Sequence, residues 1–382
     1  MNNLHVSLTN MRNESRVLKE TRSIVEHGVA ERIFIAALHD DGLEEYVEIN
    51  DRIELRRFKL CSRRLPKVFF VQMFKYLEYC FRIIIHYRKC RMGMVNVHAL
   101  GLLPMGVLLK RVLGAKLIYD THELETEKNG DKGFGKVLSK LVECIFIKSC
   151  DLVIVVSDSI ADWYSAEYKI DRPVVVMNAP RYRSPLKTNR LRAGLNISDD
   201  RKIFLYQGGL APGRGIETII EAFKRLNNKS VIVFMGYGEL APLVHEASSR
   251  YDNIYFHEAV PPDEVLEYTA SADYGLSLME NSCLSYYYCM PNKLFEYIMA
   301  CLPVIVSNMR EMAAFVIENN VGVVAEDESR EALIRAIEIL LQRDSSELLA
   351  RVNMTAEQYC WETQERIMID AYRDLLNEGH VA

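Results

Sequence analysis

The chain has 382 residues, 49% of them hydrophobic and 26% charged, which predicts a globular protein of two or three domains. Its nine cysteines contain no Cys-x-x-Cys pair, which argues against a disulfide framework or a zinc site and for a reducing compartment. We see no signal peptide at Met1–Leu8 and no uninterrupted apolar run of about 20 residues, so we expect a cytoplasmic protein without a membrane span.

The net charge of −5 is unevenly distributed along the chain. Residues 1–190 carry 31 Lys and Arg against 23 Asp and Glu, whereas the remaining residues carry 16 against 29. A basic first half and an acidic second half predict two domains with different partners.

Short apolar runs alternate with helical patterns through both halves, which predicts β-α-β units, parallel sheets and two Rossmann-like domains in an α/β fold. The polar segment 180–196 indicates a linker, and we place the domains at residues 1–182 and 183–360. A first strand is expected before Asn10, and the other expected strands are Arg32–Leu38, Met94–His98, Lys116–Tyr119, Leu152–Val156, Val174–Val176, Ile203–Gln207, Val231–Phe234, Ile254–His257, Tyr274–Leu278, Val304–Val306 and Gly322–Val324.

Residues 55–92 form a basic segment with eleven Lys and Arg, one acid and eight interleaved aromatic residues. A basic, aromatic, amphipathic segment is typical of proteins that bind an anionic membrane surface. The alternative is a core helix with solvated basic residues on its outer face. Nucleic-acid binding has only the charge in its favour, because no recognition motif accompanies it.

Two histidines follow short apolar strands in the first half. His98 lies in Val97–Pro104, and His122 lies in the run Tyr119-Asp120-Thr121-His122-Glu123-Leu124. Both can project from a sheet edge, although an isolated histidine is more often a hydrogen-bonded structural residue.

Glycine-rich turns follow two strands of the second half. Gly208, Gly209 and Arg214 lie between a strand and the expected helix Ile216–Leu226, where backbone N–H groups and an arginine can hold a phosphate. Gly236 and Gly238 form a second turn, for which a ligand contact and a plain tight turn are equally good explanations.

The run Met290–Val306 predicts a loop, a short amphipathic helix and a buried strand. It places Glu296 in the first turn of the helix, where a carboxylate can bind a ribose beside a phosphate that the helix N-terminus holds. The alternative is a carboxylate that only interacts favourably with the helix dipole.

Together these motifs resemble the GT-B glycosyltransferases, in particular glycosyltransferase family 4 of the bacterial surface-polysaccharide type. The resemblance covers nearly the whole chain, with its specific motifs at residues 97–124 and 203–306. It implies two Rossmann-like domains whose parallel sheets face each other across a cleft. It also implies that the last helix, residues 361–382, crosses back to the first domain.

The resemblance assigns the donor nucleotide to the second domain. Glu296 would bind the ribose, and Lys293 would supply the second phosphate-binding cation, because Gly209 stands where the family usually has an arginine. The donor-binding residues that it implies are Gly208, Gly209, Arg214, Gly236, Gly238, His257, Pro291, Asn292, Lys293 and Glu296.

The family's catalytic region implies roles for the remaining candidates. His122 would position the transferred sugar or stabilise the transition state, with Glu123 beside it. Tyr288 stands where many members have the first glutamate of an E-x7-E pattern, so no catalytic glutamate is carried over. The residues implied to line the sugar and acceptor cleft are Arg16, His98, Asn281 and Tyr288.

The resemblance thus implies a hexosyltransferase that works without a metal or cofactor and usually with retention. The donor would be a nucleotide-diphosphate sugar, with UDP favoured over GDP. The acceptor would be a glycan or polyprenyl-linked molecule of capsule or lipopolysaccharide synthesis, reached from the cytoplasmic face of the inner membrane through residues 55–92. Two alternatives stay open: a non-catalytic subunit that binds nucleotide sugars, and a sugar-nucleotide epimerase of the same fold. A Rossmann dehydrogenase is disfavoured, because no strand precedes a Gly-x-Gly-x-x-Gly helix start.

Overall fold

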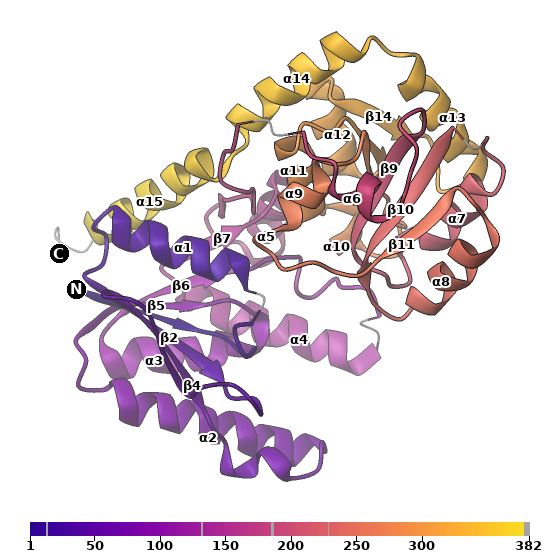
Figure 1. Cartoon of the computed structure of the whole chain (residues 1–382). Coiled ribbons are helices and arrows are strands. Elements are labelled where there is room, and N and C mark those ends of the chain that lie inside the picture. The colour runs from indigo at the N-terminus through magenta and orange to yellow at the C-terminus, as the bar shows by residue number, and fades with distance from the viewer. Residues whose placement is uncertain (13, 131–132, 185–186, 228, 378–382) are drawn as a thin grey trace. The chain divides into compact units, whose positions relative to one another are not determined.

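The computed structural model describes residues 1–12, 14–130, 133–184, 187–227 and 229–377 (Figure 1). The chain divides into two compact units. Unit 1 consists of Met1–Val176 with Glu365–Ala382, and unit 2 consists of Met177–Gln364. Each unit is an α/β structure around its own sheet, as the alternation of apolar runs and helical patterns predicts.

Unit 1 contains an eight-stranded sheet in the order β3-β4-β2-β1-β5-β6-β7-β8. All neighbouring strands are parallel except β3 and β4, which are antiparallel. The strands are β1 (Asn2–Val6), β2 (Arg32–Leu38), β3 (Tyr46–Asn50), β4 (Ile53–Phe58), β5 (Met92–Val97), β6 (Lys116–Asp120), β7 (Leu152–Val155) and β8 (Val174–Val175).

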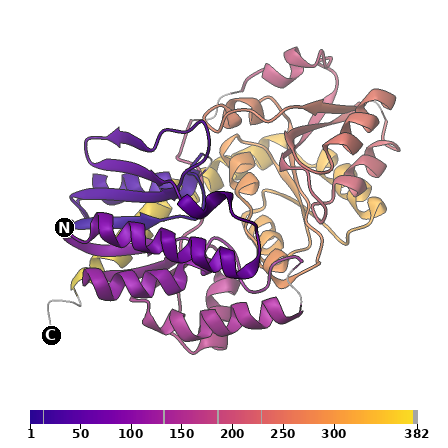
Figure 2. The same cartoon turned by 90° about the horizontal axis from the view of Figure 1, so that it is seen from below.

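Helices cover both faces of this sheet, as Figures 1 and 2 show. On one face α1 packs beside α15 (Trp361–Asn377), where the Ser23 hydroxyl donates to the Glu365 carboxylate at 2.5 Å. On the other face α3 contacts both α2 and α4. The α-helices are α1 (Ser15–Glu26), α2 (Phe69–Tyr87), α3 (Leu103–Leu113), α4 (Gly133–Phe146) and α5 (Asp158–Tyr168), with 3-10 turns at Cys61–Arg64, Leu100–Leu102 and Ile147–Ser149.

The hairpin of β3 and β4 was not expected from the sequence. Part of β4 falls within the segment 55–92, whose first residues are therefore strand rather than amphipathic surface helix. Arg57 on this strand is buried, and its guanidinium donates to the carbonyls of Asn10 and Glu44 at 2.8 and 2.9 Å. The helix that the segment does contain, α2, begins at Phe69.

Unit 2 contains a six-stranded, fully parallel sheet in the order β11-β10-β9-β12-β13-β14. All six strands were expected, and their ends differ from the expected ends by at most three residues. They are β9 (Lys202–Gly209), β10 (Ser230–Tyr237), β11 (Ile254–His257), β12 (Tyr274–Ser277), β13 (Val304–Ser307) and β14 (Gly322–Ala325).

The core of unit 2 lies on both faces of this sheet. Phe204 and Tyr206 of β9 pack with α7, α8 and α13, while Ile203 and Leu205 pack on the face covered by α11 and α12. This alternation is why the strands are apolar throughout. The helices of unit 2 are α6 (Arg190–Gly194), α7 (Ile216–Phe223), α8 (Ala241–Arg250), α9 (Val265–Thr269), α10 (Leu284–Tyr287), α11 (Asn292–Met299), α12 (Arg310–Asn319), α13 (Arg330–Gln342) and α14 (Ser345–Gln358), and most of α15 belongs to unit 1.

Candidate functional site

The two glycine turns of unit 2 lie side by side at the carboxyl ends of β9 and β10. Gly208 pairs with Gly236 across these strands. A Cβ on Gly236 would lie 1.9 Å from the Gly208 carbonyl oxygen, and one on Gly238 would lie 2.3 Å from that of Leu210. Close backbone approach therefore requires both glycines in the second turn. This favours the tight-turn explanation for Gly236 and Gly238, while their ligand contact stays a prediction.

Gly208 lies beside Lys293, which α11 directs to the same edge of the sheet. Gly208 has a φ of +110°, a conformation that essentially only glycine adopts, and its Cβ position lies 4.0 Å from the Lys293 Cε. The Lys293 ammonium lies 3.7 Å from the centre of the Tyr206 ring. The end of β9 and the start of α11 thus form one wall around this ammonium.

Lys293 is a buried cation without a hydrogen-bond partner among the described residues. Burial and the neighbouring charge of Arg214 lower its pKa to about 7, against the opposing effect of Glu296. Arg214 itself lies with its guanidinium 6.0 Å from the centre of the Tyr286 ring. Two cations, one of them desolvated, form a site that an anion with several oxygens would stabilise.

Glu296 lies at the same strand edge, but not in the first turn of its helix. It is the fifth residue of α11, so the expectation of a first-turn carboxylate is wrong. Its Oε2 accepts a hydrogen bond from Gln207 Nε2 at 2.5 Å, and Gln207 Oε1 accepts one from the Thr269 hydroxyl at 2.7 Å. The helix dipole acts mainly on the first turn, so the amide of Gln207, rather than the dipole, holds this carboxylate in place.

The other candidates of unit 2 lie on the loops around this edge. Pro291 caps α11 and the exposed Asn292 begins it. His257 ends β11, and its Nδ1 bonds the carbonyl of Glu258 at 2.7 Å. Asn281 is exposed and donates its backbone N–H to Glu328. Tyr288 follows α10, with the Arg310 guanidinium 5.9 Å from its ring centre.

In unit 1 the carboxylate of Asp120, the last residue of β6, joins three basic side chains. It accepts from Arg16 Nη2 at 2.8 Å, from His98 Nδ1 at 3.1 Å and from His122 Nε2 at 3.2 Å. Burial alone would raise the pKa of Asp120, but Arg16 and His122 hold it well below its usual range. Burial and the charge of Asp120 raise the pKa of Glu20, which also contacts Arg16 at 2.8 Å.

This network separates the first-domain candidates into two groups. Arg16 is buried and also donates to the carbonyl of Val176 at 2.8 Å, which favours a structural role, and its place in a substrate cleft stays a prediction. His98 is likewise buried, and burial lowers its pKa, which favours the structural explanation for it. The side chains of His122 and Glu123 remain 29% and 49% exposed and can therefore meet a ligand.

Two groups of side chains in unit 1 bring three potential metal ligands within 4.8 Å of one another: His5, Glu20 and His98, and His98, Asp120 and His122. The guanidinium of Arg16 pairs with the carboxylates of both groups. It already supplies the positive charge that a metal would bring, and a second cation there would be repelled. The charges therefore favour a hydrogen-bonded network over a metal site.

Two family models match the chain in succession. The model of glycosyltransferase family 4 matches residues 14–179, and that of glycosyl transferases group 1 matches residues 187–359. The chain is a family 4-like glycosyltransferase of the GT-B fold. The resemblance of its sequence motifs to the GT-B glycosyltransferases of family 4 is thereby confirmed. No curated protein sequence matches it.

Solved structures with the same fold resemble the glycosyltransferase over nearly its whole length. Sucrose-phosphate synthase from Thermosynechococcus elongatus has a TM-score of 0.80 at 16% identity, over 99% of this chain and 100% of that one. Anabaena HepE in complex with UDP and glucose has a TM-score of 0.73 at 12% identity, over 98% and 100%. The apo lipopolysaccharide outer core galactosyltransferase WaaB has a TM-score of 0.67 at 11% identity, over 98% and 99%.

The segment 55–92 of the glycosyltransferase presents apolar rather than basic side chains on its helix surface. The exposed side chains of α2 include Phe69, Phe70, Met73 and Phe74, of which Phe70 is 82% exposed. The opposite face of α2 buries Tyr79, Cys80 and Ile83 in the core, so the helix packs on the domain and the membrane contact of its exposed face stays a prediction. In the described part of the chain, no helix combines the length and the hydrophobicity needed to cross a bilayer.

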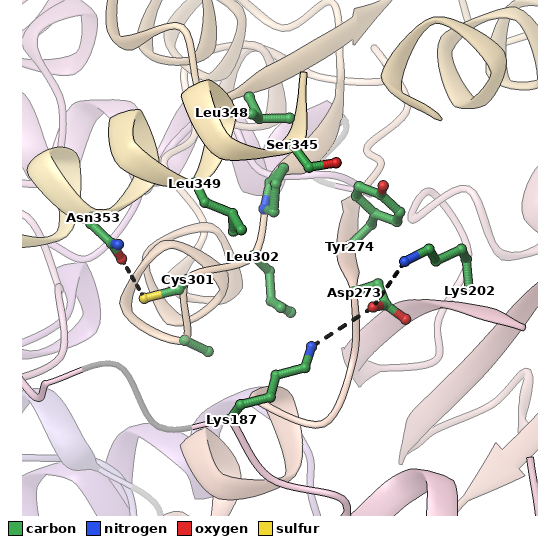
Figure 3. A pocket seen from close by; sticks show the side chains of 12 residues that line it. Lys187, Lys202, Asp273, Tyr274, Cys301, Leu302, Ser345, Leu348, Leu349 and Asn353 are labelled. Atoms are coloured by element: carbon green, nitrogen blue, oxygen red, sulfur yellow. Dashed lines mark hydrogen bonds and ion pairs between the residues drawn. The ribbon is translucent and has the colours of Figure 1, made fainter. Parts of the chain in front are cut away.

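A pocket of the glycosyltransferase, of about 320 Å³, lies at the amino ends of β9, β12 and β13 (Figure 3). Lys187 and Lys202 point to Asp273 there, each with its ammonium 3.8 Å from the carboxylate. Asp273 also accepts from the backbone N–H of Ile203 at 2.9 Å. Ligands of parallel α/β sheets bind at the carboxyl ends of the strands, so this pocket is not the donor site.

Three residues that organise the two sites of the glycosyltransferase were not assigned a role from the sequence. Gln207 holds Glu296, the ring of Tyr206 faces Lys293, and Asp120 joins Arg16 and the histidines. Gln207 and Asp120 are polar residues at the ends of apolar strands. That position is the signal that could have identified them.

Proposed function

We propose that this glycosyltransferase moves a sugar from a uridine diphosphate sugar to a glycan or polyprenyl-linked acceptor of bacterial surface polysaccharide synthesis. One observation carries the donor assignment: the buried Lys293 ammonium has no hydrogen-bond partner among the described residues, and Arg214 lies close enough to lower its pKa. A diphosphate would pair with both cations. Glu296, held by Gln207, would bind the ribose hydroxyls.

The same groups account for the chemistry of transfer. Negative charge builds up on the diphosphate as the bond to the sugar breaks, and Lys293 and Arg214 would stabilise it without a metal. A donor-phosphate oxygen would take the proton of the attacking hydroxyl, so the tyrosine at position 288 is compatible with catalysis and with retention. His122, oriented by Asp120, would contact the transferred sugar.

The choice of UDP over GDP rests on a structural relative. HepE, whose complex contains UDP and glucose, shares the fold at 12% identity. The loop that follows His257, the last residue of β11, would receive the base through backbone atoms, so its side chains would not select between uracil and guanine.

The acceptor assignment rests on the surface of unit 1. Aromatic side chains on α2 with basic residues around them would bind the cytoplasmic leaflet of an anionic membrane, where lipid-linked acceptors lie. Sedimentation with phosphatidylglycerol vesicles tests this. Phe70→Ser should reduce binding severalfold, whereas Ile317→Ser, which changes a 68% exposed side chain in unit 2, should not. Equal binding by both variants would reject this surface.

A binding and turnover screen tests the donor assignment. Calorimetry with UDP, GDP and ADP should show that UDP binds best, and UDP-sugars should release UDP slowly in water and faster with acceptor. UDP binding without release from any common UDP-sugar would favour the non-catalytic subunit. A new sugar nucleotide formed without acceptor would identify an epimerase. Preferential binding of GDP would replace the proposed base.

A further inference from the structure

An apolar groove in unit 1 adds a second feature to the α2 surface. It has a volume of about 590 Å³, within the roughly 300–1,000 Å³ of small-molecule sites. One wall comes from α2, the other from α4, and the turn before α3 forms the floor. The residues that line it are Phe69, Gln72, Met73, Tyr76, Leu100, Gly101, Pro104, Glu125, Lys128, Leu138, Ser139 and Val142.

The rims of the groove remain apolar beyond its lining. On α2 the neighbouring Phe70 and Phe74 are 82% and 57% exposed, and on α4 Val137 and Leu141 are 63% and 55% exposed. Exposed apolar side chains on two helices that flank an apolar groove mark a binding surface. The α4 side was not part of the segment that the sequence indicated.

Charge favours a lipid as the occupant. The segment 55–92 has eleven basic residues against one acid, and of these Arg64 and Lys67 are exposed directly before α2. Basic residues beside exposed aromatic side chains match the anionic headgroups and the acyl region of a bilayer. The alternative occupant is an apolar helix of a protein partner. Such a helix would bind the apolar rims, but it would not account for the excess of basic residues in the segment 55–92.

The polar end of the groove leads to the candidate sugar site. Lys128 lines the groove, and its ammonium lies 3.0 Å from Glu125 and 3.5 Å from Glu123. Glu123 directly follows His122 in the loop after β6. A lipid whose chain occupies the groove would therefore present its headgroup to the loop that carries His122.

We propose that the groove between α2 and α4 binds the isoprenoid chain of a lipid-linked acceptor. This site rests on the proposed function, because it gives the acceptor a place for its chain and directs the headgroup towards His122. The exposed apolar side chains around the groove would hold the protein on the membrane, while the groove would take up the chain of the acceptor.

Photolabelling with a benzophenone-tagged geranylgeranyl phosphate in phosphatidylglycerol vesicles tests this site. Peptide mapping should find the label on α2 and α4 at the groove. Excess geranylgeraniol should compete for labelling, and inorganic phosphate should not, because the chain is the recognised part. Competition by phosphate alone, or label spread over the surface of unit 1, would overturn the assignment.

Two variants fill the groove from opposite walls, Ser139→Trp on α4 and Gln72→Trp on α2. Each should reduce labelling at least tenfold while leaving vesicle sedimentation unchanged. The matched control is Cys144→Trp, since Cys144 is exposed on α4 outside the groove lining, and it should label like the wild type. Gln72 is exposed, so its variant keeps the test valid if Ser139→Trp fails to fold.

UDP binding is measured on every variant, because it reports on unit 2 alone. Unchanged UDP binding with unchanged labelling in both groove variants would reject the groove and leave the donor assignment intact. If the wild type does not bind UDP, the donor assignment is rejected, whatever the labelling shows.

Discussion

Lys293 makes donor binding dependent on pH. Its ammonium is buried with a pKa of about 7, and the charged or titratable groups around it are Arg214, Glu296, Cys289 and Tyr206. A diphosphate beside the ammonium favours the protonated form, so the pKa of Lys293 rises when the donor binds. Binding therefore takes up a proton in the interval between the two pKa values.

The size of the effect follows from the pKa of the free protein. Below pH 7 Lys293 is already charged, and the affinity for the donor is highest. Above pH 7 this affinity falls about tenfold for each pH unit, until the pKa of Lys293 in the complex is reached. A charge-assisted hydrogen bond contributes about 1.5–3 kcal/mol, so Lys293→Met should weaken binding by roughly 10- to 100-fold at low pH. The two proteins should converge as the pH rises.

Calorimetry with UDP-glucose from about pH 6 to about pH 9 measures this linkage, because the diphosphate of a UDP-sugar does not itself titrate in that range. Repeating each titration in buffers of different ionisation enthalpy gives the number of protons taken up. A wild-type affinity that stays constant over this range would refute the role of Lys293. So would a Lys293→Met variant that keeps the wild-type slope.

Protein stability gives an independent check with a defined sign. The pKa of Lys293 is lower in the folded than in the unfolded chain, so between about pH 7 and about 10.5 the unfolded chain binds more protons. The contribution of Lys293 to the free energy of unfolding is fully present above that interval. It decreases as the pH falls through the interval and is lost once the pH has fallen through 7. Without donor, Lys293→Met should therefore be more stable than the wild type at pH 6, and the difference should shrink towards pH 9.

Two further substitutions separate binding from turnover. Glu296→Ala should weaken UDP affinity by roughly 5- to 30-fold, about 1–2 kcal/mol, without unfolding the protein, and unchanged affinity in calorimetry would remove its assignment as the ribose ligand. His122→Ala should lower the turnover of a UDP-sugar by about 100-fold or more with little change in donor affinity, and a loss confined to affinity would reject its role at the sugar.

The sheet of unit 2 could be predicted well because each of its strands is buried on both faces. Runs such as Val304–Val306 are apolar throughout, which leaves little choice of secondary structure. The edge hairpin of unit 1 could not be predicted in this way. Strand β3 (Tyr46–Asn50) is half exposed and includes Glu48, so its pattern resembles that of a polar loop.

The candidate site shows where residue patterns stop being informative. The helix Asn292–Met299 was expected, but the register that puts Glu296 in its second turn depends on the proline cap, which a motif does not specify. Arg16 shows the same limit. Its loop position suggested exposure, whereas the partner that buries it, Asp120, lies 104 residues further along the chain.

The pair of Arg16 and Asp120 gives the final prediction, because it connects the stability of unit 1 to the orientation of His122. Removing one partner of a buried ion pair leaves an uncompensated charge and typically costs about 3–5 kcal/mol. Arg16→Met should therefore destabilise the protein by about that amount in urea unfolding. The double variant Arg16→Met with Asp120→Asn should lose less than the sum of the single variants, because neither charge then remains buried.

A surface pair provides the control for this cycle. Arg172 and Asp162 are 2.7 Å apart with side chains 48% and 65% exposed, and Arg172→Met should cost about 1 kcal/mol or less. Equal losses for Arg16→Met and Arg172→Met would show that the buried pair contributes no more than a solvated one. In that case Asp120 would not be held firmly enough to orient His122. Because the carboxylate would then not act on His122, turnover by Asp120→Asn should depend on pH in the same way as turnover by the wild type.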